Sequence, residues 1–311
     1  MTRNQRVYVT GAAGFLGRHT ARRLAQAGFA VAGIGHDNWR DAEWRSWGMD
    51  YWHGASVNVI SLRHLAEKVG EPSLIFHCAG SGSVGFSLRH PYEDFKRTVD
   101  STAQVLEFAR MQQVPARVVY PSSAAVYGKS AELRIPETAL TNPVSPYGLH
   151  KHMAEQICTS YARHASVPVC IVRFFSLYGA GLCKQLLWDA ACKAKEGGFT
   201  FFGSGEEQRD WLHVADAAAL MQLAAEHASL DAPIVNGGTG IGTTIREVLT
   251  VFGQHWPVPK TPSFTGQTKT GDPSRLVADI ATLNRWGFTP AVSLENGLRQ
   301  YIQWICIEQG V

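Results

Sequence analysis

Three glycines that follow the first apolar run constrain the fold of this chain more than any other feature. The run RVYV leads into TGAAGFLG, residues 10–17, where Gly11, Gly14 and Gly17 form the pattern G-x-x-G-x-x-G. At a turn from strand to helix, such glycines permit a tight turn, a close approach of a pyrophosphate and close packing of helix on strand. The helix that follows would point free N–H groups at the anion. The segment therefore predicts a βαβ unit that binds a dinucleotide.

Short apolar runs alternate with amphipathic segments through the first half of the chain. The amphipathic segments at 19–28, 91–112 and 145–165 predict helices, the first ending at a glycine cap. Strands are predicted at 6–11, 29–35, 73–80, 116–123 and 167–175. The later strands are almost continuously apolar, as in strands that helices cover on both faces. This alternation predicts an α/β fold with a Rossmann-like, doubly wound parallel sheet.

The rhythm changes after Phe175, where loops, short strands and helices follow in no regular order. We therefore expect a dinucleotide-binding domain over residues 1–175, with a segment that returns to it near residues 212–240. Residues 176–311 would form mainly a smaller C-terminal lobe that binds the substrate. In such folds the ligands bind at the carboxyl ends of the strands.

Composition limits the kinds of binding partner and the cellular compartment that we expect for this protein. The formal charge of +3 is not gathered into runs, which argues against nucleic acid or a membrane as partner and leaves a small anionic ligand possible. No signal peptide and no membrane-spanning apolar stretch is recognised, so we expect a cytoplasmic protein. The six cysteines lack zinc-ligand spacing, so we expect reduced thiols and no metal.

Tyr147 and Lys151 lie four residues apart in a predicted helix that Ser145 and Pro146 open, so they share one helix face. A nearby ammonium and an oxidised nicotinamide both favour the phenolate and lower the pKa of a tyrosine. Such a tyrosine can take a proton from an alcohol while hydride leaves the same carbon. A serine at the end of the preceding strand, in SSAAVYG, can orient that oxygen.

The segments TGAAGFLG, HCAG, SSAAVYG, SPYGLHK, RFFSLYG and RDWLHVADAA occur in this order along almost the whole chain. In this the chain resembles the extended short-chain dehydrogenase/reductase family, and within it the nucleotide-sugar epimerases and dehydratases of the UDP-galactose 4-epimerase type. The resemblance implies an enzyme that acts on a nucleotide-diphosphate sugar with NAD or NADP.

The resemblance also implies roles for single residues. Ser123 matches the catalytic serine or threonine and would contact the substrate, Tyr147 matches the base, and Lys151 its partner. Arg209 would grip the substrate diphosphate, and further substrate contacts would come from Ser176, Lys269 and Arg275. The residues expected at the cofactor are Gly11, Gly14, Phe15, Leu16, Gly17, Gly35, His36, Asp37, Arg40, Val57, Ala79, Gly80, Ser122, Tyr147 and Lys151.

Several positions depart from the family pattern. Ala124 and Ala125 stand where the 4,6-dehydratases carry Asp-Glu, so a dehydratase is disfavoured. Gly35 stands where the family usually has an Asp that holds the ribose of NAD, although counting from the glycine turn reaches Asp37 instead. Ser56 also replaces an acidic residue that is common near the adenine. With His36 and Arg40 nearby, we lean slightly to NADP.

Three functions remain open from the sequence. The first is a 4-epimerase that works through a transient 4-keto sugar, and the second is an NADPH-dependent 4-ketoreductase with the same residues. The third, a non-catalytic dinucleotide sensor, ranks lowest because both Tyr147 and Lys151 are present. The predicted helices 91–112 and 145–165 are expected to pair in a homodimer as a four-helix bundle. Their apolar faces would be supplied by Phe95, Val99, Leu106, Met153 and Ile157.

Overall fold

The computed structural model describes residues 5–36, 39–267 and 273–309 of the chain. The chain divides into two compact units. The first unit comprises Met1–Gly128, Leu140–Phe174 and Ala217–Val235, and the second comprises Lys129–Ala139, Phe175–Asp216 and Asn236–Val311. Residues 129–139, which the sequence-based division places in the first domain, therefore group with the second unit.

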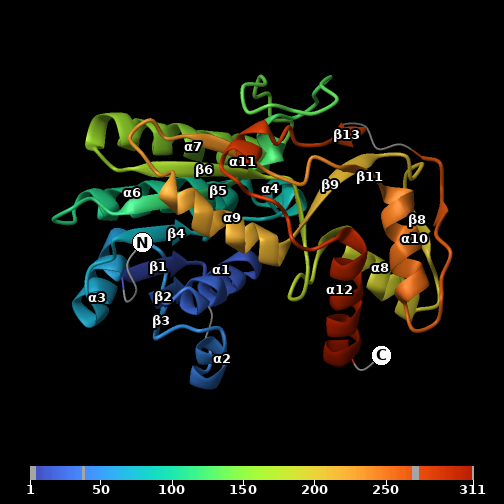
Figure 1. Ribbon diagram of the computed structural model, residues 1–311, viewed down its shortest axis with the longest axis horizontal. Coiled ribbons are helices and arrows are strands. Elements are labelled where there is room, and N and C mark those ends of the chain that lie inside the picture. Colours follow the sequence, from blue (N-terminus) through green and yellow to red (C-terminus); the bar gives the residue numbers. More distant parts are fainter. Residues whose placement is uncertain (1–4, 37–38, 268–272, 310–311) are drawn as a thin grey trace. The chain divides into compact units, whose positions relative to one another are not determined.

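A seven-stranded sheet of described residues runs through the first unit, in the order β10-β6-β5-β4-β1-β2-β3 (Figure 1). The strands are β1 (Arg6–Thr10), β2 (Ala30–Gly35), β3 (Tyr51–Gly54), β4 (Leu74–His77), β5 (Arg117–Ser123), β6 (Val169–Phe174) and β10 (Ile234–Gly237). The pairings β1–β2, β2–β3, β1–β4, β4–β5 and β5–β6 are parallel. The chain order reverses between β1 and β4, which confirms the predicted Rossmann-like, doubly wound sheet.

Helices cover both faces of this sheet. On one face lie α3 (Val59–Val69), α6 (Ser101–Arg110) and α7 (Pro146–Ala165), packed side by side. They share a buried core with the strands, which includes Tyr8, Leu62, Phe108 and Cys158. On the other face lie α1 (Phe15–Gln26) and α9 (Val214–Glu226), which Figure 1 shows in front of the strands. Arg23 of α1 donates a hydrogen bond to Gln222 of α9 at 2.8 Å. The predicted glycine cap of α1 is Gly28, at φ +88°.

The predicted helix at 91–112 is built from three consecutive pieces. These are α5 (Pro91–Phe95), a π-helical segment (Lys96–Asp100) and α6. Val99 and Leu106 on them are 4% and 0% exposed, because they pack inside the unit. The expectation that these two side chains belong to a dimer face is therefore wrong. The remaining short helices of this unit are α2 (Asp41–Ser46), α4 (Val84–Arg89) and the 3-10 turn Ala124–Val126.

The second unit is organised around β9 (Gln208–His213). Three short strands pair with it, namely β7 (Ser176–Tyr178) and β13 (Arg275–Leu276) in parallel and β11 (Gly242–Thr244) antiparallel. A two-stranded sheet joins β8 (Thr200–Phe201) and β12 (Ser263–Phe264). The helices are α8 (Gln185–Lys195), α10 (Ile245–His255), α11 (Ala281–Arg285) and α12 (Leu294–Gln309). Phe199, Phe252 and Trp256 stack between them, so this unit has its own aromatic core.

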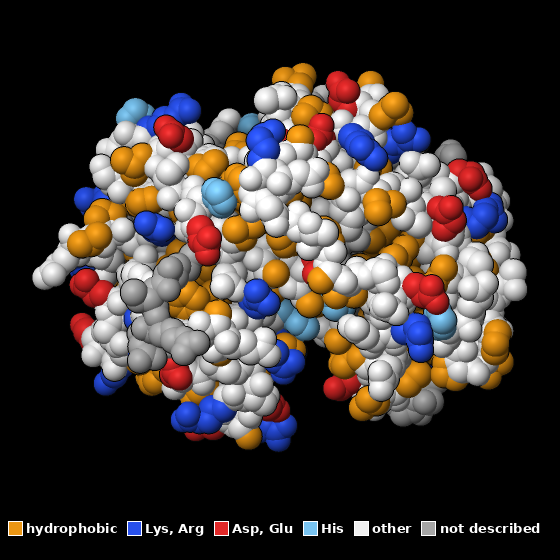
Figure 2. Space-filling model, in the orientation of Figure 1, with side chains coloured by type: hydrophobic (Ala, Val, Ile, Leu, Met, Phe, Trp, Pro, Cys, Tyr) orange, Lys and Arg blue, Asp and Glu red, His pale blue; other side chains and the backbone are white. Residues whose placement is uncertain are grey.

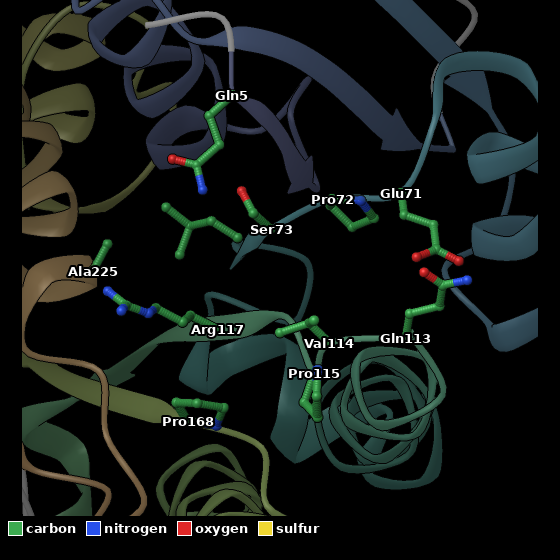
Figure 3. A pocket seen from close by; sticks show the side chains of 11 residues that line it. Gln5, Glu71, Pro72, Ser73, Gln113, Val114, Pro115, Arg117, Pro168 and Ala225 are labelled. Carbon is green, nitrogen blue, oxygen red and sulfur yellow. The ribbon is translucent and has the colours of Figure 1, made fainter. Parts of the chain in front are cut away.

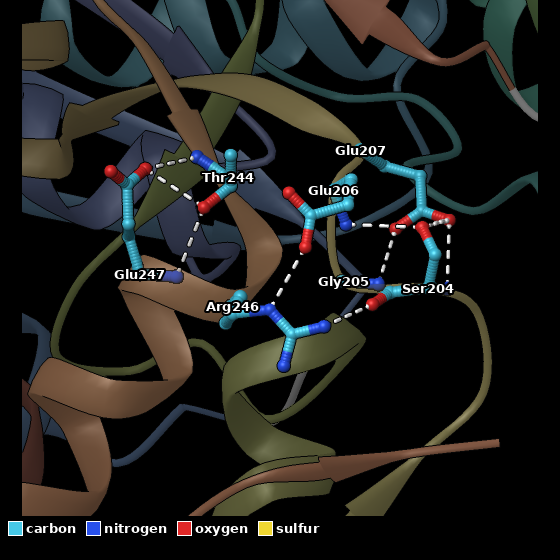
Figure 4. Close-up of polar contacts among 7 residues, drawn as sticks. All are labelled: Ser204, Gly205, Glu206, Glu207, Thr244, Arg246 and Glu247. Carbon is cyan, nitrogen blue, oxygen red and sulfur yellow. Dashed lines mark hydrogen bonds and ion pairs between the residues drawn. The ribbon is translucent and has the colours of Figure 1, made fainter. Parts of the chain in front are cut away.

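A polar network fixes the turn between β8 and β9 to the start of α10 (Figure 4). Thr244 and Glu247 form a capping box at the first turn of α10. Arg246 donates to the Glu206 carboxylate at 2.9 Å and to the Ser204 carbonyl at 2.6 Å. The Glu207 carboxylate closes the turn, since it accepts from Gly205 N at 3.0 Å. The beginning of β9 is thereby held in place.

Two surface observations bear on the expected partners. On the face drawn in Figure 2, the Lys and Arg side chains are interspersed with Asp and Glu. Among the described residues, no helix is both long enough and apolar enough to cross a lipid bilayer.

Candidate active site

The glycine turn after β1 forms a cradle that no larger residue could occupy. Gly11 has φ +62°, and a Cβ atom there would lie 2.6 Å from the backbone nitrogen of Ala79. At Gly17 a Cβ atom would lie 2.2 Å from the Gly11 oxygen. Gly14 is the N-cap of α1 and supplies no side-chain cap, so the first N–H groups of this helix keep their capacity to bind an anion. The turn therefore fits the pyrophosphate of a dinucleotide.

The end of β4 lies directly against this turn. The Ala79 N–H donates to the Thr10 hydroxyl at 3.1 Å, which holds the segment beside the end of β1. The next residue, Gly80, has φ +140°, and a Cβ atom there would approach the Lys151 Nζ to 3.9 Å. Ala79 and Gly80 thus connect the glycine turn with the predicted catalytic lysine. This is the place expected for the backbone beneath a cofactor.

The structure brings the predicted serine and tyrosine together through the start of α7. Ser145 caps this helix by accepting from the Gly148 N–H at 3.2 Å. A Cβ atom at Gly148 would lie 2.5 Å from the Ala125 oxygen, so the helix start packs directly on the turn that follows Ser123. The Tyr147 N–H also donates to Ser87 of α4 at 3.0 Å. These contacts place Tyr147 within hydrogen-bonding reach of the Ser123 side chain.

Lys151 lies one turn further along α7, with its side chain buried. Its Nζ donates to the Pro121 carbonyl of β5 at 2.8 Å and lies 4.9 Å from the centre of the Tyr120 ring. Burial lowers the pKa of Lys151 to about 8, although the acidic groups of Cys78, Glu155 and Asp94 act in the opposite direction. A lysine in this state can change its protonation near neutral pH.

The pKa of the Tyr147 phenol is raised above its ordinary value of 10.0. Burial is the main cause, the hydrogen bond with Ser123 acts to lower the pKa, and the negative charge of Asp94 raises it. Burial therefore outweighs the effect of Ser123. A phenolate at this position needs further positive charge close by, which an oxidised nicotinamide ring carries.

Ser122 and Ser123 extend to opposite faces of β5, as neighbours in a strand do. Ser123 is half-buried, and its hydroxyl accepts from the Ala125 N–H at 3.2 Å. Ser122 is only 4% exposed, and its hydroxyl helps to lower the pKa of Glu155. A direct contact between Ser122 and the cofactor remains a prediction.

Two buried polar side-chain pairs behind the site were missed in the sequence. Glu155 of α7 accepts from Arg173 of β6 at 2.9 and 2.7 Å, and both side chains are almost fully buried. Two features of the sequence could have indicated the Glu155–Arg173 pair. Glu155 lies four residues after Lys151, on the same helix face, and Arg173 is a charged residue within an apolar run that predicts a buried strand. The second pair joins His150 and Asp94 at 2.6 Å. No spacing in the sequence connects these two residues.

The end of β2 differs from the expected ribose site. Gly35 lies beneath the Trp52 indole, because a Cβ atom at Gly35 would be 2.9 Å from the Trp52 Cη2. His36 is exposed, and Val57 packs partly on the core. Arg40 is largely exposed and forms an ion pair with Glu43, its Nε lying 2.9 Å from the carboxylate. Asp37 lies outside the described residues. Phe15 and Leu16, in the first turn of α1, are half-buried.

Three predicted substrate residues lie on neighbouring strands of the second unit. Arg209 is on β9, and it pairs with Leu276 of β13, next to Arg275. Ser176 begins β7 and pairs with Trp211, two residues after Arg209. The fourth, Lys269, lies outside the described residues. The structure thus brings Arg209, Arg275 and Ser176 to one small sheet.

Asp210 organises this sheet and was also missed. It is fully buried, and its carboxylate accepts from Thr239 N at 2.7 Å, Thr239 Oγ1 at 2.8 Å, Gly240 N at 2.9 Å and Ala278 N at 3.2 Å. It therefore ties β9 to the segments that precede β11 and follow β13. The position of Asp210 next to Arg209 in the sequence does not indicate that its carboxylate binds these remote residues.

A cavity of about 840 Å³ lies elsewhere in the first unit (Figure 3). It opens at the amino ends of β4 and β5 and is lined by Gln5, Glu71, Ser73, Val114 and Arg117. Ligands of parallel α/β sheets bind at the carboxyl ends of the strands, where Ser123 and the glycine turn lie. This cavity is therefore separate from the candidate active site.

Known proteins that are similar to this chain in sequence or in structure share the fold described above. The model of the NAD dependent epimerase/dehydratase family matches residues 7–238. A UDP-glucose 4-epimerase of Rhizobium leguminosarum bv. trifolii is 28% identical, with 96% of each chain covered.

Two solved structures are similar over almost the whole chain. The UDP-glucose 4-epimerase of Thermotoga maritima, solved with UDP-glucose, has a TM-score of 0.87 at 24% identity and covers 98% of this chain and 100% of its own. The UDP-glucose 4-epimerase of Brucella ovis, solved with NAD, has a TM-score of 0.84 at 27% identity and covers 96% and 98%.

Proposed function

The chain belongs to the NAD dependent epimerase/dehydratase family, and on that premise we propose that it is a 4-epimerase of a nucleotide-diphosphate sugar. The observation that carries this proposal is the gathering of Ser123, Tyr147 and Lys151 next to the glycine turn, at the carboxyl ends of β1 and β5. The UDP-glucose 4-epimerases among the relatives support a UDP-hexose as the substrate.

The residues can perform this reaction in the following way. Tyr147 takes the proton of the sugar 4-hydroxyl, while Ser123 donates a hydrogen bond that holds the same oxygen. Lys151 supplies positive charge beside the tyrosine and would hold the ribose of the nicotinamide. A nicotinamide dinucleotide held at the glycine turn and beside Lys151 would supply reversible hydride transfer with the sugar C4. Tyr147 then gives its proton back to the oxygen.

Ala124 and Ala125 separate this activity from the removal of water. They occupy the 3-10 turn that follows Ser123, and neither side chain can transfer a proton. A dehydratase needs an acid and a base there in addition to the tyrosine. The same residues would also serve a 4-ketoreductase, but the epimerases among the relatives favour the first reaction.

Substrate binding is proposed for the small sheet of the second unit. Arg209 and Arg275 supply two guanidinium groups on adjacent strands, suited to a diphosphate. Ser176 would add a hydroxyl from β7, and Lys269 would add an ammonium. Asp210 would act indirectly, because its four hydrogen bonds hold the strand that carries Arg209.

The dinucleotide is NAD or NADP. The Brucella ovis relative was solved with NAD, which supports NAD. The end of β2 supports NADP, because Gly35 stands where the family carboxylate would hold the ribose hydroxyls.

A homodimer in the cytoplasm completes the proposal. The helices around α7 expose apolar side chains, among them Leu88 (63% exposed), Tyr92 (73%) and Leu149 (46%), and Phe95, Met153 and Ile157 lie half-buried near them. A second copy of the chain would cover this surface. Light scattering at micromolar concentration should give the mass of a dimer, and a strictly monomeric mass would contradict it. All six cysteines are free thiols, which suits a reducing compartment.

The activity is tested by incubating the purified protein with UDP-glucose and following the sugar anomeric signals by NMR. We expect UDP-galactose to appear without added cofactor, because an epimerase regenerates its dinucleotide in each turnover. The same assay with UDP-N-acetylglucosamine and UDP-glucuronic acid identifies the preferred sugar. If no 4-epimer of any of these forms while a dinucleotide is bound, the proposal is wrong.

A further inference from the structure

The carboxylate of Asp94 is enclosed against α7 with a single hydrogen-bond partner. Asp94 lies on α5 and is 0% exposed. Its Oδ2 lies 2.6 Å from the Nδ1 of His150 on α7, and the His150 ring packs edge to face on Phe95, with ring centres 5.7 Å apart. Its Oδ1 is also buried, and no residue that the structure describes donates a hydrogen bond to it. Because an ionised carboxyl group has about four acceptor sites, most of those of Asp94 are left without a donor.

The catalytic residues lie on the side of α7 against which α5 packs. His150 and Lys151 lie three and four residues after Tyr147, so the three share one side of this helix. α5 and the π-helical segment that continues it contact the same part of α7. Gly80 lies between that segment and Lys151, since a Cβ atom at Gly80 would be 3.6 Å from the Arg97 oxygen and 3.9 Å from the Lys151 Nζ. α5 therefore belongs to the wall behind Tyr147 and Lys151.

Asp94 acts on the proton of Tyr147 through its charge. Burial is the main cause that raises the pKa of the Tyr147 phenol, the hydrogen bond with Ser123 lowers this pKa, and Asp94 raises it further. Glu155 lies two turns further along α7, but Arg173 binds both of its oxygens and supplies a full counter-charge. Asp94 has no lysine or arginine partner among the described residues. Its charge is therefore free to oppose the loss of the Tyr147 proton.

Other titratable groups face the same place from the elements packed around it. They are His77 and Cys78 at the end of β4, Tyr120 on β5, and Lys151, Glu155 and Cys158 on α7. Burial lowers the pKa of His77 to about 3 and raises the pKa of Cys78 to about 12, so both are uncharged near neutral pH. Burial also raises the pKa of Tyr120 and that of Cys158. These four groups therefore do not compensate the charge of Asp94.

We propose that Asp94 is a positioning residue of the active site, which holds the proton on Tyr147 so that the tyrosine becomes a base only beside an oxidised nicotinamide. The proposal rests on the proposed function, since it takes Tyr147 as the base. A negative charge close to a phenol disfavours the phenolate, and the positive ring of the cofactor favours it. His150 fixes the position of the Asp94 carboxylate through its Nδ1. Proton transfer would then start only when a hydride acceptor is present.

The test measures the ionisation of Tyr147 directly. The near-ultraviolet absorbance of the phenolate is titrated with pH in the full-length protein freed of copurifying nucleotide, and the titration of the matching Tyr147→Phe variant is subtracted. The midpoint of the wild type should fall when NAD is added, or NADP if only that dinucleotide binds. A wild-type midpoint that the dinucleotide does not lower would overturn the proposal.

Asp94→Asn removes the charge while it keeps the shape of the side chain and an oxygen that can accept from His150. It should lower the midpoint by about half a pH unit or more, both with and without the dinucleotide. An unchanged midpoint would overturn the proposal. If Asp94→Asn does not fold, Asp94→Leu/His150→Leu removes the carboxylate together with its partner and should lower the midpoint in the same way. An unchanged midpoint in this double variant would also contradict the role of Asp94.

Glu93→Gln is the matched control. Glu93 precedes Asp94 on α5, but its side chain is 43% exposed and forms an ion pair with Arg97 at 3.0 Å. The loss of this exposed charge should leave the midpoint of Tyr147 unchanged, because water screens it. A shift as large as that of Asp94→Asn would show that the effect is not specific to the buried carboxylate, against the proposal.

The pH dependence of turnover gives a second readout. Turnover of the preferred UDP-hexose should fall at low pH as Tyr147 gains its proton, and in Asp94→Asn this fall should move to lower pH by the same amount. If Asp94→Asn instead lowers turnover at every pH without this displacement, Asp94 has only a structural role.

The absorbance titrations need no sugar. A protein whose midpoint shifts as expected but which converts no UDP-hexose would contradict the proposed function and support the effect of Asp94 on Tyr147. A protein that epimerises a UDP-hexose and keeps its midpoint in Asp94→Asn would do the reverse.

Discussion

The Nζ of Lys151 donates a hydrogen bond to the carbonyl oxygen of Pro121 at 2.8 Å, which ties the second turn of α7 to the end of β5. The two strand residues that follow Pro121 are Ser122 and Ser123, and Tyr147 lies one turn before Lys151 on the helix. This bond therefore fixes the distance between the two elements that carry the proposed catalytic residues.

Tyr147→Phe should lower turnover by about a hundredfold or more, because the change removes the group that carries the proton. Folding and dinucleotide binding should stay near those of the wild type. Turnover is measured by NMR with the preferred UDP-hexose, and folding by urea unfolding. Tyr161→Phe is the control on the same helix, since its hydroxyl bonds only weakly to Glu107 at 3.3 Å. If both variants keep wild-type turnover, Tyr147 is not the base.

Ser123→Ala should lower turnover less than Tyr147→Phe and more than Ser122→Ala. The reason is geometric, because Ser123 reaches Tyr147 whereas Ser122 is buried on the other face of β5. The comparison uses kcat for the three variants under identical conditions. A larger loss in Ser122→Ala than in Ser123→Ala would reverse the assignment of the two serines.

The stability of the protein should depend on the proton of Lys151. The pKa of this lysine is about 8 in the folded protein, below its ordinary value of 10.5, because burial disfavours the charge. Between these two values the unfolded chain keeps a proton that the folded protein has released, so the free energy of unfolding rises with pH. Relative to Lys151→Met, the wild type should gain about 3 kcal/mol across this range, at about 1.4 kcal/mol per pKa unit.

Urea unfolding of both proteins between pH 8 and pH 10.5 measures this difference. The comparison with Lys151→Met removes the contribution of every other group that titrates in the same range. A difference that stays constant with pH would show that the pKa of Lys151 is not lowered.

Glu155→Gln should destabilise the protein by about 3–5 kcal/mol, because it leaves the buried Arg173 guanidinium without its counter-charge. The double variant Glu155→Leu/Arg173→Met should recover much of this loss, since it removes both charges together. Unfolding in urea measures the free energies of all three proteins. A double variant that is less stable than Glu155→Gln would mean that the pair contributes more than mutual neutralisation.

Gly35→Ala should destabilise the protein by about 1–3 kcal/mol, because the new methyl group meets the rigid Trp52 ring at 2.9 Å. Adding Trp52→Leu should restore part of this loss by opening the space. Gly85→Ala is the control, since the nearest atom to its new methyl group would be 3.8 Å away. Thermal unfolding compares the four proteins. If Gly35→Ala is as stable as Gly85→Ala, Trp52 does not occupy the place of the family carboxylate.

The structure changes one expectation about cofactor choice. From the sequence, Gly35→Asp would restore a preference for NAD by supplying the missing carboxylate. Because Trp52 fills that space, the aspartate needs Trp52→Leu beside it before its carboxylate can reach the ribose. The preference for NAD should therefore be measured in the double variant Gly35→Asp/Trp52→Leu.

The sequence by itself determined the class of the fold and predicted the centre of the chemistry, because both depend on local patterns. Alternating apolar runs and amphipathic segments define strands and helices by their period, and the glycine triplet requires backbone conformations and close approaches that only glycine allows. Tyr147 and Lys151 lie on one helix face by their spacing alone. These inferences need no knowledge of remote contacts.

Only the tertiary structure decided which remote side chains meet. It showed that Trp52 covers Gly35, that Arg18 reaches across to Trp39, and that His150 pairs with Asp94. Residues of this kind are separated by 17 to 56 positions, and their contacts arise only when strands and helices from distant segments pack together. Burial, which sets the pKa of Lys151 and the stability of the Glu155–Arg173 pair, also depends on that packing. A local sequence pattern does not contain information about this packing.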